Sequence, residues 1–152
     1  MEFKFIENPG ITAVNEIRDR LKAYNNQFWE VTDKPQYSLT VNEDGCLVGG
    51  LVFSVFGDWL ELDFLWVDQG FRGRGVGKEL LARAEAYAKD CGCKTAVVNT
   101  MSFQAKPFYE KNEYVLMYTQ KNYPKTSSRY YLEKKLTWTM KCMDSYVYQS
   151  RW

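Results

Sequence analysis

Residues 59–78 read WLELDFLWVDQGFRGRGVGK, and they place a strand, a loop and the start of a helix one after another. The nearly continuous apolar run Trp59–Val67 predicts a buried strand. The loop that follows is rich in glycine, which lets backbone N–H groups come close to a ligand, and the helix dipole beyond it favours negative charge. Arg72, Arg74 and Lys78 add positive charge at the same place. This stretch therefore predicts a site for a phosphate-bearing ligand.

The helix behind the loop has the clearest pattern in the chain. Its apolar residues recur three and four positions apart, and Gly92 is placed to end it. Next comes Thr95–Asn99, which is short, apolar and β-branched, as expected of a strand that pairs in parallel with Trp59–Val67 after a helical crossover. The apolar positions of the helix are Leu80, Leu81, Ala84, Tyr87, Ala88 and Cys91.

The flanking segments alternate between strand and helix patterns. A brief alternation at 3–6 predicts a short strand, and spacing by three and four predicts a helix from Thr12, which would cap it, toward Trp29. Further strands are expected at 37–41, 46–56, 114–119 and 130–136, and a short helix at 104–112. We expect an α+β fold, with a mixed, mostly antiparallel sheet that has a central parallel strand pair and flanking helices. One domain over 1–136 and an extension over 137–152 are predicted.

The composition excludes several kinds of protein. The chain has 152 residues, no histidine and a net charge of +1. Catalytic triads and zinc sites that need histidine are therefore excluded, and no metal is expected. The four cysteines are expected to be reduced, buried residues of a cytoplasmic protein. No apolar run is long enough for a membrane span, and no basic cluster suggests nucleic acid, so neither partner is expected.

Charge is distributed unevenly along the chain. Residues 1–68 hold 5 basic and 12 acidic residues, whereas residues 69–120 hold 8 basic and 5 acidic ones. If the two segments line two halves of one site, a cationic ligand would meet the acidic half and a polyanion the basic half. The charges could equally be spread over solvated faces.

The glycine-rich loop does not fit either common nucleotide motif. A P-loop would need a glycine where Arg72 stands and a hydroxyl residue where Glu79 stands, and a dinucleotide fingerprint would need a glycine at Lys78. Arg72–Gly77 instead reads Arg-x-x-Gly-x-Gly, and with Phe64–Val67 before it and Ala105–Tyr114 after it the chain resembles the GNAT acetyltransferase superfamily. The resemblance covers about residues 3–136.

This resemblance implies an acyl-CoA site. The pyrophosphate would bind backbone N–H groups of the loop, and the pantetheine arm would lie along the strand as an added strand does. A backbone N–H at the end of the strand would stabilise the charge on the thioester oxygen. The residues implied to bind acetyl-CoA, the co-substrate, are Leu65, Trp66, Val67, Arg72, Gly73, Arg74, Gly75, Val76, Gly77, Lys78, Ser102 and Tyr109.

The resemblance also implies the catalytic groups. Tyr109 matches the tyrosine that protonates the CoA sulfur, although core packing alone would also explain it. Glu61 takes the place of the strand glutamate that acts as base, and Asp63, two residues on, faces the same side and competes for that role. The two carboxylates could instead anchor a cationic amine, or could form a solvated edge. Aromatic residues including Phe28, Trp29 and Tyr37 are the candidates for the acceptor site.

Two positions depart from the family pattern. Ser102 stands where an asparagine is common, so a contact to pantetheine would weaken or move to Gln104. Glu113 replaces a glycine, so we expect Asn112 to take the left-handed turn. The segment 137–152 lies beyond the pattern and is rich in aromatic residues, which suggests an added strand or a contact with a second subunit in a homodimer.

The predicted function is direct transfer of an acetyl group from acetyl-CoA to a primary amine of a small molecule. The alternatives are a non-catalytic acyl-CoA-binding module, an acetyltransferase that acts on a protein N-terminus or lysine, and transfer to a hydroxyl group.

Overall fold

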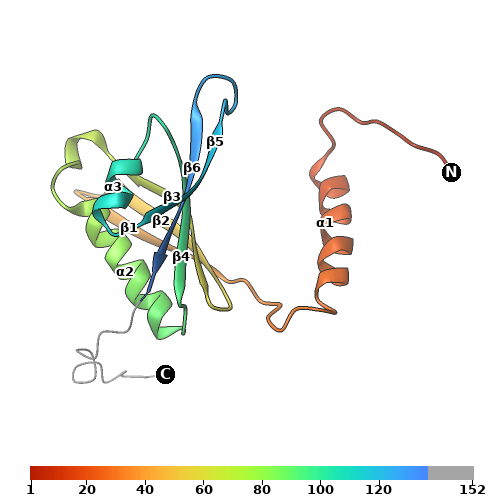
Figure 1. Cartoon of the computed structure of the whole chain (residues 1–152), viewed down its shortest axis with the longest axis horizontal. Coiled ribbons are helices and arrows are strands. Elements are labelled where there is room, and N and C mark those ends of the chain that lie inside the picture. The colour runs from red at the N-terminus through yellow and green to blue at the C-terminus, as the bar shows by residue number, and fades with distance from the viewer. Residues whose placement is uncertain (137–152) are drawn as a thin grey trace. The chain divides into compact units, whose positions relative to one another are not determined.

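A computed structural model of the chain describes residues 1–136 and divides it into two units, Met1–Asp33 and a second unit that begins at Lys34. The second unit is built on a six-stranded sheet in the order β1-β2-β3-β4-β6-β5 (Figure 1). The strands are β1 (Gln36–Glu43), β2 (Cys46–Phe56), β3 (Trp59–Val67), β4 (Thr95–Met101), β5 (Val115–Lys121) and β6 (Ser128–Lys135). Only β3 and β4 pair in parallel, so the predicted α+β mixed sheet is confirmed.

The first unit contains one helix, α1 (Ile11–Asn25). Gly10 precedes this helix and no side chain caps it, so the prediction that Thr12 caps the helix is wrong. The strand predicted at 3–6 is also wrong, because these residues have no strand conformation. Four alternating residues carry too little information for a strand, which exists only through hydrogen bonds to a partner.

An irregularity interrupts the antiparallel pairing of β2 with β3. Phe53 pairs with Leu62 and Val52 pairs with Phe64, so the backbone register between the strands skips Asp63. An extra residue of this kind is a β-bulge, which bends the strand and turns the following side chains to the other face. Leu60 and Leu62 are buried before the bulge, whereas Phe64 and Trp66 are exposed after it.

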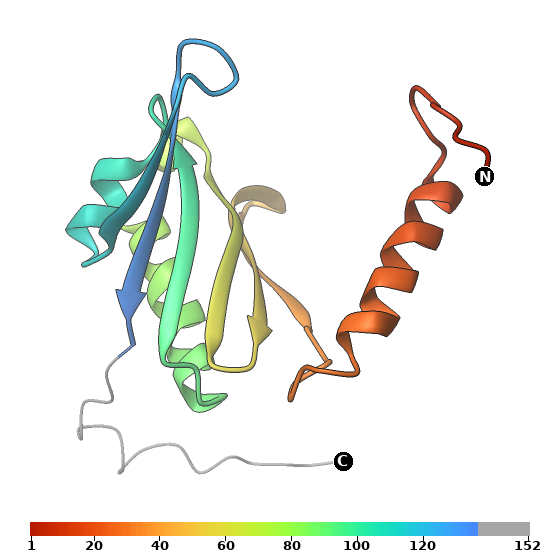
Figure 2. The ribbon, with the colours of Figure 1, turned by 45° about the vertical axis from the view of Figure 1, so that its right-hand side comes forward.

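The parallel pair β3–β4 holds together over only part of its length. Trp59–Leu62 pair with Thr95–Val98, and the strands part beyond those four pairs. Figure 2 shows the two strands side by side at the lower end of the sheet. The backbone of β3 beyond Leu62 therefore has an edge that faces β4 without pairing to it.

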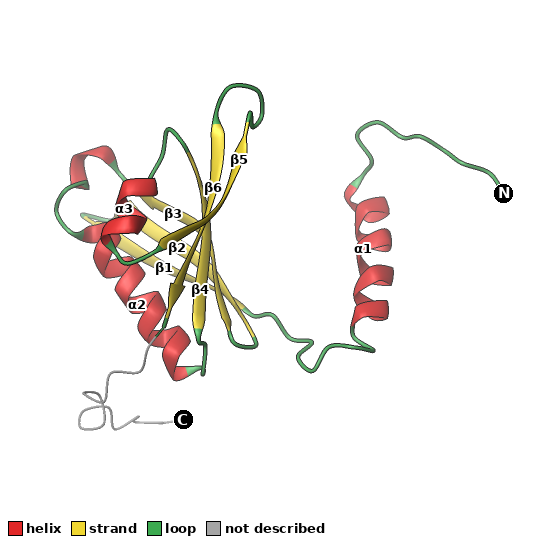
Figure 3. Ribbon diagram, in the orientation of Figure 1, coloured by secondary structure: helices red, strands yellow, loops and turns green. Residues whose placement is uncertain are grey.

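The main helix, α2 (Val76–Asp90), covers one face of the sheet (Figure 3). Leu80, Leu81, Ala84 and Ala88 are buried against Leu51, Leu60 and other core residues of the strands. Gly92 has a φ of +89°, a left-handed conformation that glycine adopts without strain and that ends the helix as predicted. Of the predicted stripe, Tyr87 and Cys91 are exposed.

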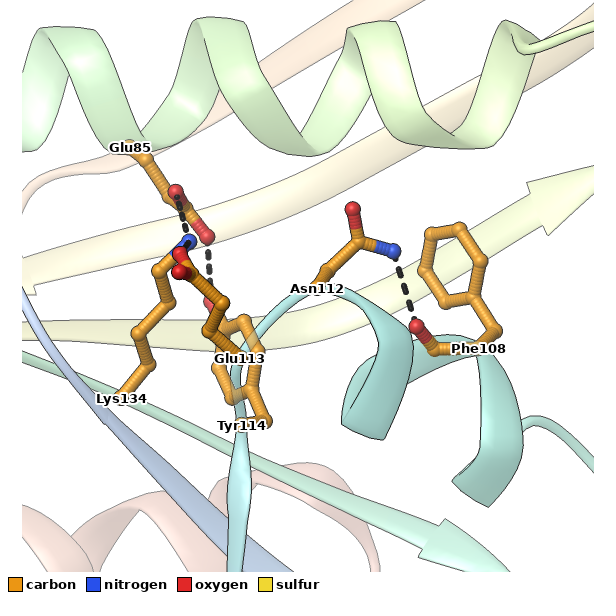
Figure 4. A network of polar contacts seen from close by, with 6 residues as sticks. All are labelled: Glu85, Phe108, Asn112, Glu113, Tyr114 and Lys134. Atoms are coloured by element: carbon orange, nitrogen blue, oxygen red, sulfur yellow. Dashed lines mark hydrogen bonds and ion pairs between the residues drawn. The ribbon is translucent and has the colours of Figure 1, made fainter.

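The short helix α3 (Lys106–Lys111) has Pro107 in its first turn, as predicted, and leads into the β5–β6 hairpin. Asn112 caps the C-terminal end of α3 and has a φ of −102°. Glu113, the next residue, takes the left-handed conformation, with a φ of +70°. The prediction that Asn112 takes this turn is therefore wrong. Asn112 instead donates a hydrogen bond of 2.8 Å from its side chain to the carbonyl of Phe108 (Figure 4).

A buried polar network joins α2 to the hairpin. The Glu85 carboxylate on α2 accepts a 3.0 Å hydrogen bond from the Tyr114 hydroxyl and lies 2.8 Å from Lys134 Nζ on β6 (Figure 4). The Glu85 side chain is 9% exposed and that of Lys134 is 15% exposed. This ion pair therefore fixes the hairpin to the helix that carries the glycine-rich loop.

The remaining predictions concern the C-terminal extension, the cysteines and membrane spans. The extension 137–152 lies outside the described residues, as does Cys142. Of the described cysteines, all with free thiols, only Cys93 is buried, so the expectation of burial was wrong for Cys46 and Cys91. Within residues 1–136 no helix is long and apolar enough to cross a membrane.

Candidate active site

The loop between β3 and α2 is shaped by its own side chains. The Asp68 carboxylate accepts a 2.8 Å hydrogen bond from the backbone N–H of Gly70, and Arg72 Nε donates one of 3.0 Å to the carbonyl of Val67. Gly73 and Gly75 have positive φ values of 74° and 84°, and Gly75 caps α2. The first N–H groups of α2 have no partner within the helix, so they are available to an anion at this end.

A groove of about 1070 Å³ begins at this loop and runs between the parted strands β3 and β4. We call it the interstrand groove. In the part of the chain that the structure describes, its cationic side chains are Arg72, Lys78 and Lys111 and its one carboxylate is Asp63. The predicted cofactor residues that line it are Leu65, Trp66, Val67, Arg72, Gly73, Gly75, Val76, Gly77, Lys78 and Tyr109.

Two predicted cofactor residues do not line the interstrand groove. The Arg74 guanidinium lies over the Phe71 ring, 4.9 Å from its centroid. The Ser102 hydroxyl accepts a hydrogen bond from the backbone N–H of Ser128. Gln104 does line the groove, and its side-chain oxygen accepts a 2.9 Å hydrogen bond from the N–H of Met101.

Tyr109 on α3 reaches the interstrand groove from the core side. Its side chain is largely buried and packs edge-on against the rings of Phe108 and Tyr114. Burial raises the pKa of Tyr109 to about 12, because the phenolate would lose its hydration. The hydroxyl therefore keeps its proton at neutral pH and can donate it to a ligand in the groove.

A second cavity of about 1010 Å³ opens on the face of the sheet opposite α2. We call it the sheet-face cavity. Glu61 lies in it and pairs with Lys34, whose Nζ is 2.5 Å from Glu61 Oε2. Asp63 also lies in it, and its Oδ2 accepts hydrogen bonds of 2.9 Å from Gln36 and 3.0 Å from Ser54. The two carboxylates share one side of the strand, as predicted.

The two cavities meet where β3 and β4 part. Leu62, Asp63, Phe64, Val98 and Asn99 line both of them. Among residues 1–136, the sheet-face cavity is lined by three carboxylates, Glu61, Asp63 and Glu133, and by one cation, Lys34. A cationic ligand is therefore favoured in this cavity and an anionic one at the loop end of the groove, with reactive ends that could meet beside Asp63.

Of the predicted acceptor aromatics, Tyr37 does not line this cavity. Tyr37 stacks on Phe53 and contacts Tyr87 of α2 edge-on, so it faces the helix-covered side of the sheet. Its neighbour Gln36 lines the cavity instead. Phe28 and Trp29 belong to the first unit, where Phe28 packs against Tyr24.

Sequence reasoning missed several polar residues of the sheet-face cavity, namely Lys34, Gln36, Ser54, Asn99, Tyr131 and Glu133. Asn99 had a signal, since it is the polar residue that ends the apolar run Thr95–Val98. Lys34 and Gln36 had none, because their importance comes from carboxylates 27 residues further along the chain.

Comparison with known proteins agrees with this geometry. Residues 8–114 match the family model described as the acetyltransferase (GNAT) family. Blasticidin-S acetyltransferase of Streptomyces morookaense is 45% identical over 95 residues, which cover 62% of this chain and 70% of that protein. Acetyltransferase Atu2258 of Agrobacterium fabrum is 36% identical over 112 residues, covering 73% and 82%. The crystal structure of an acetyltransferase from Bacillus cereus superposes with a TM-score of 0.77 at 33% identity, over 87% of this chain and 97% of that one.

Proposed function

Because the chain belongs to the GNAT family of acetyltransferases and is an acetyl-CoA-dependent N-acetyltransferase, we propose that it acetylates a primary amine of a small molecule by direct transfer. One observation carries this proposal. A groove with cationic side chains and a cavity rich in carboxylates meet at Asp63, where β3 and β4 part. A polyanionic donor and a cationic acceptor can therefore approach one another from opposite sides of the strand.

The loop and the parted strand would hold acetyl-CoA. The pyrophosphate binds the N–H groups at the start of α2, with Arg72 and Lys78 adding charge. The pantetheine arm lies along Leu65–Val67, whose backbone is not paired to β4. A backbone N–H of this segment stabilises the negative charge that develops on the thioester oxygen during attack. Ser102 and Arg74 are the weakest members of the predicted cofactor set, because neither lines the groove.

Transfer to the amine needs two proton movements. The acceptor ammonium loses a proton to a carboxylate, Glu61 or Asp63, directly or through water. The free amine attacks the carbonyl carbon, the carbon–sulfur bond breaks, and the departing thiolate takes a proton from the Tyr109 hydroxyl. The position of Tyr109 in the interstrand groove supports this role, and its hydroxyl is protonated at neutral pH; burial, which raises its pKa to about 12, makes it a weaker acid than an exposed tyrosine.

A small cationic acceptor suits the sheet-face cavity. Its carboxylates outnumber its single cation, and a volume of about 1010 Å³ is in the range of small-molecule sites. The relative that is 45% identical is a Blasticidin-S acetyltransferase, which supports a small molecule as the acceptor here.

Thiol release from acetyl-CoA tests this function. We expect release with a panel of primary amines, which would include polyamines, aminoglycosides and blasticidin S. Tyr109→Phe should lower kcat by about 10²–10³-fold and leave the Kd for acetyl-CoA unchanged. Tyr118→Phe is the matched control, because Tyr118 is exposed and lines neither cavity.

Two results would contradict the proposal. Binding of acetyl-CoA without thiol release for any amine would indicate a binding module rather than an enzyme. A product that resists amine-specific reagents but is cleaved by base would indicate transfer to a hydroxyl group.

A further inference from the structure

The ion pair between Lys34 and Glu61 places a primary ammonium group inside the proposed acceptor cavity. Lys34 Nζ lies 2.5 Å from Glu61 Oε2 and 6.0 Å from the centroid of the Phe56 ring. The backbone beside Lys34 is fixed, since the carbonyl of Pro35 accepts a 3.1 Å hydrogen bond from the N–H of Val55 on β2. The lysine side chain therefore reaches Glu61 from a strand-bound segment of the same unit.

This contact resembles the one that an acceptor would make. A lysine side chain is a four-carbon alkyl chain that ends in –NH₃⁺, the same group as a protonated primary amine. Glu61 lies in the sheet-face cavity, which is continuous with the interstrand groove at Leu62 and Asp63. Glu61 thus already binds a primary alkylammonium group in the absence of an acceptor.

We propose that Lys34 is a specificity-determining residue, whose ammonium occupies Glu61 until the ammonium of the acceptor displaces it. The inference rests on the proposed function and deepens it, because it identifies Glu61 as the anchor for a primary alkylammonium group. Lys34 competes with the acceptor for the Glu61 carboxylate. It therefore selects acceptors whose ammonium group binds Glu61 more strongly than a lysine side chain does.

Displacement is feasible at this position. The side chains of Lys34 and Glu61 are 45% and 34% exposed, and ion pairs with that degree of hydration contribute little free energy. The released ammonium can be solvated without moving the backbone. Asp63 differs, because its hydrogen-bond donors are the neutral groups of Gln36 and Ser54, so its charge stays available to the incoming cation.

The same exchange also positions the amine. Displacement of Lys34 brings the acceptor ammonium to the Glu61 carboxylate, beside the point where the two cavities meet.

Lys34→Met tests the inference, because methionine keeps an unbranched side chain and removes the charge. We expect KM for a primary monoamine to fall by about two- to fivefold, the range for a hydrated ion pair, with kcat unchanged. The fall should vanish in the Glu61→Gln background, where there is no anion to compete for. Lys94→Met is the matched control, since Lys94 Nζ pairs with Asp58 at 2.6 Å outside both cavities, and KM should not change.

A binding measurement separates this inference from the proposed function. NMR titration of the CoA-bound protein with n-butylamine, which has the length of a lysine side chain, should give a Kd lowered two- to fivefold by Lys34→Met, whether or not the amine is acetylated. A raised Kd, a raised KM or a lowered kcat would show that Lys34 instead positions Glu61, and would overturn the inference. Absence of thiol release in the wild type would contradict the proposed function alone.

Discussion

Arg72 Nε donates a 3.0 Å hydrogen bond to the carbonyl of Val67, the last residue of β3. This contact folds the start of the glycine-rich loop back onto the end of the strand. The Arg72 side chain also lines the interstrand groove. One guanidinium group therefore shapes the loop and supplies charge to the proposed phosphate site.

Arg72→Lys should weaken acetyl-CoA binding although it keeps the charge. Lysine has a single side-chain nitrogen, which cannot both donate to Val67 and present its charge to the groove. The loop therefore loses its hydrogen bond to the Val67 carbonyl. We expect the Kd for acetyl-CoA, measured by isothermal titration calorimetry, to rise about tenfold, the effect of losing one hydrogen bond of about 1.4 kcal/mol. Arg83→Lys is the control, because Arg83 pairs with Glu79 on α2 and lines neither cavity. An unchanged Kd would show that the Val67 contact is not needed.

Asp63→Asn should act on the amine and not on the cofactor. Asparagine keeps the size of the side chain and an oxygen for Ser54 and Gln36, but it removes the negative charge where the cavities meet. We expect KM for a cationic amine to rise about tenfold, with KM for acetyl-CoA within about twofold of wild type. Steady-state kinetics with each substrate varied in turn distinguishes the two. A rise confined to acetyl-CoA would assign Asp63 to the cofactor.

Lys134→Met should destabilise the fold. The variant leaves the Glu85 carboxylate buried with only the Tyr114 hydroxyl as partner (Figure 4), and an unpaired buried charge is costly. We expect the free energy of unfolding in urea to fall by about 3 kcal/mol. Lys94→Met, whose partner Asp58 is exposed, should cost less than about 1 kcal/mol. Equal effects for the two lysines would show that burial of the Glu85 pair is unimportant.

Glu113→Gly should stabilise the fold. Glu113 has a φ of +70°, a conformation that costs a residue with a Cβ about 1–2 kcal/mol. Its side chain is 83% exposed, so little free energy is lost with its 3.5 Å ion pair to Lys134. Glycine removes the strain but adds entropy to the unfolded chain, so the expected net gain is about 0.5–1 kcal/mol. Glu110→Gly within α3 should instead cost about 1 kcal/mol. Thermal and urea unfolding of the two variants would show opposite signs if this explanation is correct.

Stability should fall at alkaline pH because of two buried tyrosines. Burial raises the pKa of Tyr109 to about 12, and burial together with the charge of Glu85 raises the pKa of Tyr114 well above its usual range. A tyrosine in the unfolded chain ionises at about pH 10. Above that pH the unfolded chain therefore binds fewer protons than the folded one. These two tyrosines should therefore leave the free energy of unfolding unchanged below about pH 9 and lower it from about pH 10 upward. Tyr114→Phe should make that decline shallower, whereas the exposed Tyr118→Phe should not.

Local patterns in the sequence were sufficient for the elements that carry the cofactor site. The strand Trp59–Val67 was predicted with the ends that the structure has, and the helix behind it ends at Gly92 as expected. These signals are local, since apolar spacing, glycine and charge act within one turn or one strand. The pairing of β3 with β4 also followed, because a helical crossover leaves little choice of direction.

Other features depend on pairing between distant residues, and the sequence carried no signal for them. The bulge at Asp63 arises from the register of β2 against β3, and the helix-facing position of Tyr37 depends on which face of β1 the core covers. The left-handed residue after α3 was misassigned, because intrinsic preference favours asparagine whereas the path of the chain into β5 places Glu113 there.

The sequence by itself determined the glycine-rich loop and the resemblance to the family, because both are a matter of residue type and spacing, and that resemblance in turn implied Tyr109, Glu61 and Asp63 as candidates. Only the tertiary structure decided which groups they meet. Lys34 reaches Glu61 across 27 residues of chain, and Asp63 joins two cavities because β3 and β4 part after Leu62. Contacts of this kind follow from strand register and packing. Both depend on all the strands of the sheet together, so no single segment of the sequence predicts them.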